Sequence, residues 1–218
     1  MSTKTYTPDG FSPAQLISTV KVTQQPSGWL QFSLSAPGLS LWLQHINQQG
    51  RRDELFSQTR LTLSSSLQAD TLGWQVQLAY SRCCTLLKLA ERHQTLQFCR
   101  PPAAADRYQL AGADLFSPRL NTGLALASSG TRQLIHSLID ATDRWAANQE
   151  DRSDLRSGDR LLKLAATVAK AFEQFDQATP LWSLSLAQRR LCLGLVRSVQ
   201  VILQRLAFGP LGPLTEQL

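Results

Sequence analysis

Arginine and lysine side chains are the residues of this sequence most able to do chemistry, because their spacing aligns them on predicted helices. Lys163 and Lys170 are seven residues apart, as are Arg190 and Arg197, which places each pair on one helix face. Aligned cations can bind the phosphates of a nucleic acid, or they can simply keep a helix surface solvated. The sequence leaves both interpretations open. The phosphate-binding candidates are Arg82, Lys88, Lys163, Lys170, Arg189, Arg190, Arg197 and Arg205.

The distribution of charge favours a basic surface near the end of the chain. The 218 residues carry a formal net charge of +6, and no acidic residue lies between Asp176 and Glu216. Four of the candidate arginines fall in that acid-free stretch. A locally basic region of this kind suits a polyanionic partner.

Cysteine, histidine and serine give no sign of catalysis or of metal binding. The cysteines form no C-x-x-C pair, and the histidines are scattered without metal-ligand spacing. No serine lies in a recognisable nucleophile motif. We therefore expect no metal and no cofactor, and we interpret the cysteines as reduced and mostly buried. The residues considered are Cys83, Cys84, Cys99, Cys192, His45, His93 and His136.

The elements that must position the basic residues are amphipathic helices. The stretch 161–175 reads LLKLAATVAKAFEQF, and its apolar residues recur at helical spacing. Similar stripes predict helices over 74–92, 131–147 and from Ser185 to Gly209-Pro210, with 93–130 as a long irregular stretch. The central stripe consists of Leu161, Ala165, Val168, Phe172 and Phe175; that of the last helix consists of Leu191, Leu195, Val199, Ile202 and Leu206.

Shorter elements precede the helices. We expect a short helix over 12–20, two paired strands over 20–24 and 29–35, and a helix over 37–48. Alternation in the second strand predicts that Leu30, Phe32 and Leu34 form a half-buried face.

The predicted fold is mostly α: a helical bundle preceded by a small α+β module. The expected division is a module over 1–50, a linker over 51–73 and a bundle over 74–218. Ser183 or Ser185 is expected to cap the last helix, and Ser185 with Gln188 forms a capping box. No apolar run is long enough for a membrane helix, and the N-terminus lacks a secretory h-region, so we expect a cytoplasmic protein without a membrane partner.

Three stretches resemble arginyl-tRNA synthetases, whose C-terminal DALR anticodon-binding domain is a helical bundle. Residues 28–50 resemble the end of the synthetase N-terminal domain. In 74–92 the matching residues are Gln77, Ala79, Arg82, Cys84, Leu87 and Lys88; in the last helix they are Arg190, Leu191, Cys192, Leu193, Val199, Val201, Ile202, Leu203, Leu206, Gly209 and Pro213. The central helix also resembles the third quarter of that domain.

The resemblance implies a DALR-like bundle that binds tRNA without catalysis. The catalytic domain of the synthetases has no counterpart, and neither an H-x-G-H nor a K-M-S-K element occurs. Leu78, Asp176 and Glu216 occupy positions where the family has groups near the anticodon loop, and Tyr80 is the one replacement aromatic. We therefore expect a non-catalytic protein that binds tRNA or a tRNA-like stem-loop, through Tyr80 and the basic residues. It would act alone or beside a protein partner such as a synthetase. The alternative is a protein-interaction module that uses the bundle as a scaffold.

Overall fold

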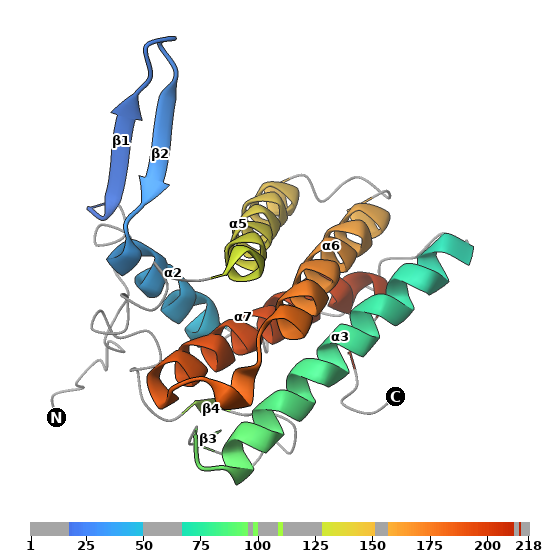
Figure 1. The fold of residues 1–218 in the computed structure, drawn as a ribbon. Coiled ribbons are helices and arrows are strands. Elements are labelled where there is room, and N and C mark those ends of the chain that lie inside the picture. Colours follow the sequence, from blue (N-terminus) through green and yellow to red (C-terminus); the bar gives the residue numbers. More distant parts are fainter. Residues whose placement is uncertain are drawn as a thin grey trace, which may run out of the picture.

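The computed structural model confirms a mostly α fold in which a helical bundle follows a small α+β module (Figure 1). It describes residues 18–49, 67–95, 98–99, 109–110, 128–150, 157–211 and 214. The predicted short helix over 12–20 lies largely outside these ranges, as does most of the irregular stretch predicted over 93–130. None of the helices in the described ranges is both long and apolar enough to cross a lipid bilayer.

Four long helices build the bundle: α3 (Leu67–Arg92), α5 (Ser129–Glu150), α6 (Ser157–Ala178) and α7 (Leu186–Leu211). Helix α6 packs against each of the other three, and α3 also packs against α7. The central stripe is buried as predicted, except that Leu161 at its first turn is half-buried. The whole stripe of α7 is buried as well. Burial of these apolar side chains away from water is the main favourable contribution to the stability of the bundle.

Two helices are longer than predicted. Helix α3 begins at Leu67 instead of Trp74, so residues 67–73 of the predicted linker are helical, and α7 continues past Gly209-Pro210 to Leu211. Gly73 was interpreted as part of the linker. It is buried inside α3, where a Cβ atom would lie 3.1 Å from Cδ2 of Leu211. The contact between the two helices therefore outweighs the low helix propensity of glycine.

A two-stranded antiparallel sheet leads into the first described helix. Strand β1 (Val20–Gln24) pairs with β2 (Leu30–Leu34), with Val22 opposite Phe32, as the alternating sequence predicted. Gly28 adopts a φ of +84° in the connecting turn, a region that favours glycine. Helix α2 (Ala36–Gln49) follows, and its Gly38 amide donates to Oγ of Ser35 over 3.3 Å.

The predicted half-burial of the second strand is wrong at Leu30. This side chain is 56% exposed, and Val22 on the paired strand is 53% exposed. Strand β2 contacts α2, while the hairpin extends away from the four long helices (Figure 1). The alternation correctly predicted a strand paired with β1, but the bundle does not cover Leu30.

The chain between α6 and α7 is tightly turned. A 3-10 helix η4 (Leu181–Ser183) follows Pro180, which agrees with the predicted end of the central helix. Ser185 then caps α7: its Oγ accepts from the amide of Gln188 over 3.4 Å, and Oε1 of Gln188 accepts from the amide of Ser185 over 3.3 Å. The capping box is confirmed. A second small sheet pairs β3 (Phe98–Cys99) with β4 (Gln109–Leu110), within the stretch 93–130 that was predicted to be irregular.

Candidate nucleic-acid interface

One end of the bundle brings an exposed tryptophan together with basic side chains. Trp182 lies in η4 and is 36% exposed. The guanidinium of Arg189, in the first turn of α7, lies 5.6 Å from the centroid of the Trp182 ring. This separation is within the range of a cation–π contact.

Backbone carbonyls fix the position of Arg189. Its Nη2 donates to the carbonyl oxygens of Trp182 and Leu184 over 2.7 and 3.1 Å, and its Nε donates to that of Leu181 over 3.3 Å. The guanidinium thus binds the carbonyls of Leu181 and Trp182 in η4 and that of Leu184 directly after it, and the Leu181 carbonyl also accepts from the amide of Leu184 over 3.4 Å. Arg189, predicted as a phosphate ligand, mainly holds the turn that carries Trp182.

The C-terminus of α3 completes this cluster. The amide of Thr95 donates to the carbonyl of Ala90, that of Gln94 donates to Glu91, and Gln94 has a φ of +53°. These bonds form a Schellman motif, which ends a helix with a left-handed residue. The motif places His93 beside η4, with its ring centroid 5.3 Å from that of Trp182 and the ring planes tilted by 45°.

Arg190 of α7 contacts the C-terminal end of α3, and among the residues that the structure describes its terminal nitrogens have no hydrogen-bond partner. Its Nε donates to the carbonyl of Thr95 over 3.2 Å, and the side chain is exposed. A guanidinium has five N–H donors, and the four on the terminal nitrogens can bind a phosphate in a fork. Arg92, at the end of α3, is exposed at the same end of the bundle. We refer to Arg92, His93, Trp182, Arg189 and Arg190 as the η4 cluster.

Tyr80 and Arg82 on α3 do not belong to this cluster. Tyr80 is 6% exposed, so it presents no ring face to a splayed base, and its predicted stacking role is not supported. Nε of Arg82 donates to Oδ2 of Asp176 over 2.8 Å. Asp176 therefore neutralises this neighbouring candidate cation.

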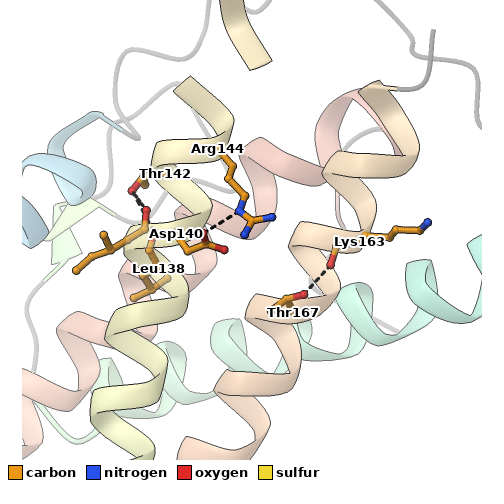
Figure 2. Close-up of polar contacts among 7 residues, drawn as sticks. Leu138, Asp140, Thr142, Arg144, Lys163 and Thr167 are labelled. Carbon is orange, nitrogen blue, oxygen red and sulfur yellow. Dashed lines mark hydrogen bonds and ion pairs between the residues drawn. The ribbon is translucent and has the colours of Figure 1, made fainter. Parts of the chain in front are cut away.

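Lys163 and Lys170 lie exposed on α6, as their spacing predicted. Figure 2 shows Lys163 extending away from α5, while Oγ1 of Thr167 donates to the Lys163 carbonyl over 3.0 Å. Across from it, Arg144 of α5 is paired with Asp140 over 2.8 Å. Lys163 lies near the start of α6, whereas η4 follows the last turn of that helix. At a rise of 1.5 Å per residue, this separates Lys163 from the η4 cluster by about 20 Å.

The remaining predicted phosphate-binding residues, Arg197, Arg205 and Lys88, lie outside the η4 cluster. Arg197 is half-buried, and its Nη1 donates to Oε1 of Gln200, whose own side chain is buried and donates to Sγ of Cys84 over 3.0 Å. Arg205 lies over the ring of Trp145 at 5.6 Å. The predicted pair Arg190 and Arg197 is therefore divided between an exposed and a half-buried site. Lys88 is half-buried as well.

The cysteines are unsuited to nucleophilic chemistry in the described part of the chain. Cys83, Cys84 and Cys192 are buried free thiols. Burial, and then the neighbouring Cys84, raises the pKa of Cys83 well above its ordinary value. Burial alone raises the pKa of Cys192 to about 11. Within the ranges that the structure describes, no three histidine, cysteine or acidic residues gather as metal ligands.

The sequence interpretation missed His93 and Trp182 as members of an interface. A signal for Trp182 was present, since this aromatic residue lies two positions after Pro180 and seven before Arg189. His93 had no such signal, because its proximity to Trp182 arises from the packing of α3 against α7. In comparisons with protein-family models, with curated proteins and with solved structures, this chain matches none.

Proposed function

We propose that this protein is a non-catalytic RNA-binding protein, similar to the tRNA-binding parts of arginyl-tRNA synthetase, and that it binds a tRNA or tRNA-like stem-loop through the η4 cluster. The observation that carries the proposal is the exposed Trp182 beside Arg189 and Arg190. Proteins bind unpaired RNA by combining cations for the phosphates with aromatic rings for the bases.

The electrostatic setting supports the proposal. Neither η4 nor α7 contains an acidic residue, and the chain carries a net charge of +6. Arg190 offers its terminal N–H groups, and Arg92 adds a second exposed cation. We also propose the cytoplasm as the compartment, since the buried cysteines of the described ranges are free thiols.

A second candidate function is protein binding through the β1–β2 hairpin. Trp29, Leu30 and Val22 are 77%, 56% and 53% exposed. Large apolar side chains left exposed to solvent occur at many protein-binding surfaces. A synthetase is one such partner that the resemblance suggests. In that case partner binding should respond more to Leu30→Ser than to any change at Arg190.

The test is a titration of labelled tRNA against the full chain at two salt concentrations. If phosphate contacts supply much of the affinity, log K should fall by about 0.7 for each phosphate contacted on a single strand as log salt rises. Arg190→Glu should weaken binding strongly. Lys163→Glu is the matched control, because it makes the same charge change on the exposed face of α6, away from the cluster.

Three outcomes would decide between the functions. Loss of binding with Arg190→Glu alone supports the η4 cluster. Equal loss with both variants would indicate general charge attraction and would contradict a site at this end. No binding by the parent protein at low salt would contradict RNA binding and favour the hairpin as a protein-binding surface.

A further inference from the structure

We propose that Trp182 stacks an unpaired nucleobase, and that His93 occupies the place of this base until RNA binds. This inference rests on the proposed RNA-binding function and adds the kind of RNA that the η4 cluster selects. It follows from the different ways in which the two neighbours of the Trp182 ring are held.

Arg189 is a fixed neighbour of the ring. Three carbonyl oxygens, those of Leu181, Trp182 and Leu184, accept hydrogen bonds from its guanidinium. Since these bonds lie within the same turn as Trp182, the ring and the cation keep their positions together. Arg189 therefore stabilises the ring without competing with a ligand.

His93 is a loosely held neighbour. It is exposed, it follows the last residue of α3, and within the described part of the chain its ring makes no hydrogen bond. Its 45° tilt against Trp182 is far from the parallel arrangement of a stacked base. Stacking of a base on an aromatic side chain is stronger than an ordinary contact between two aromatic side chains. A base can therefore replace His93 at the ring.

The ligand must then carry at least one unpaired base close to its phosphates. In a blunt RNA duplex both faces of each internal base are covered by its neighbours, and the bases are not available for stacking on a protein. A hairpin loop or a single-stranded end offers such a base, with phosphates within reach of Arg190. The cluster should thus prefer a stem-loop to the same stem without its loop.

The decisive variant is His93→Ala, measured with a labelled RNA stem-loop and with a blunt duplex of the same stem sequence. If His93 competes with a base, its removal should raise the affinity for the stem-loop by about 3- to 10-fold, the equivalent of one aromatic contact. Affinity for the duplex should stay unchanged. His136→Ala, which removes an exposed histidine of α5, is the matched control and should change neither.

Trp182→Ala provides the complementary measurement. It should lower stem-loop affinity about tenfold and leave duplex affinity unchanged, whereas Trp182→Phe should keep part of the stem-loop preference. Thermal melting of each variant confirms that the bundle is intact.

A drop in stem-loop affinity with His93→Ala would show that His93 itself contacts RNA, and would overturn the inference. Equal binding of stem-loop and duplex by the parent protein would also overturn it, while leaving RNA binding in place. Failure of both RNAs to bind would instead contradict the proposed function. These results are distinct, so each can be assigned to one proposal.

Discussion

At the scale of single residues, the burial of a side chain decides what it can do. Tyr80 is predicted to contact RNA but lies in the core, and Arg82 is predicted to bind phosphate but is paired with Asp176. Arg190 remains exposed with its terminal N–H groups available. The predicted phosphate-binding residues therefore include cations that hold the fold, cations that are paired with an acid and cations that can bind a ligand. The sequence alone does not distinguish these three groups.

Phe172 provides a test of the core at this scale. It is almost completely buried and its ring lies 6.5 Å from that of Phe175. Phe172→Ala should lower the free energy of unfolding by about 3–5 kcal/mol, because it removes apolar contacts and leaves a cavity. Urea denaturation measures this change. Gln174→Ala, on the exposed side of the same helix, is the control, and an equal effect of the two variants would contradict the assigned core.

Cys192 links stability to pH. Burial raises the pKa of its thiol to about 11, whereas the same group in the unfolded chain titrates near 9.0. Between these values the unfolded state loses its proton and the folded state keeps it. The contribution of Cys192 to the free energy of unfolding is therefore present below about pH 9 and is lost as pH rises toward about 11.

Urea denaturation between about pH 9 and pH 11 should show the contribution of Cys192 as a difference between the parent protein and Cys192→Ala. The decline in stability of the parent protein should be steeper than that of Cys192→Ala, by at most about 1.4 kcal/mol per pH unit. Parallel declines would mean that the thiol is more accessible to water in solution than its burial indicates.

At the scale of elements, short polar contacts determine where the helices begin and end. Two different capping motifs lie at the η4 cluster: a Schellman motif ends α3, and a capping box begins α7. Arg189 satisfies the carbonyls of the turn between α6 and α7. These contacts place His93, Trp182 and Arg190 at one end of the bundle.

The capping box can be tested with one pair of variants. Ser185→Ala should lower the free energy of unfolding by about 0.5–2 kcal/mol, because the amide of Gln188 loses its acceptor. Ser183→Ala should have a smaller effect, since the exposed Ser183 hydroxyl only donates to the Pro180 carbonyl. Thermal or urea denaturation of both variants gives the comparison. A larger effect at Ser183 would contradict the assignment of Ser185 as the cap.

At the scale of the whole molecule, the fold presents two separate surfaces. The η4 cluster lies where α3, η4 and α7 meet, and the β1–β2 hairpin, with its exposed Val22, Trp29 and Leu30, extends beyond α2 (Figure 1). We propose the first surface as the RNA-binding site and the second as the alternative site for a protein partner. A chain with both could bind an RNA while contacting a partner, and separate variants at Arg190 and Leu30 can measure the two activities independently.

The absence of catalysis is a prediction at the same scale. We expect no aminoacylation of tRNA and no arginine-dependent exchange between ATP and pyrophosphate, because the sequence lacks the elements with which the synthetases bind ATP. The purified protein should give the background rate in an exchange assay, with an active arginyl-tRNA synthetase as the positive control. Arginine-dependent exchange above that background would contradict a non-catalytic function.

The sequence alone determined the main elements because their signals are local. The spacing of Val168, Phe172 and Phe175 defines a helix face whatever that face packs against, and Ser185 and Gln188 form their cap within four residues. The alternation of β2 likewise predicted its pairing with β1. Hydrophobic periodicity and capping depend on neighbours in the chain, so one sequence suffices to identify them.

Only the tertiary structure decided which side chains meet. The contact between His93 and Trp182, the bond from Arg190 to Thr95 and the pairing of Arg82 with Asp176 all join residues about 90 positions apart. The close approach of Gly73 in α3 to Leu211 of α7 is likewise a contact between residues far apart in the chain. Such contacts follow from how the helices pack against one another, which the periodicity of a single helix does not specify.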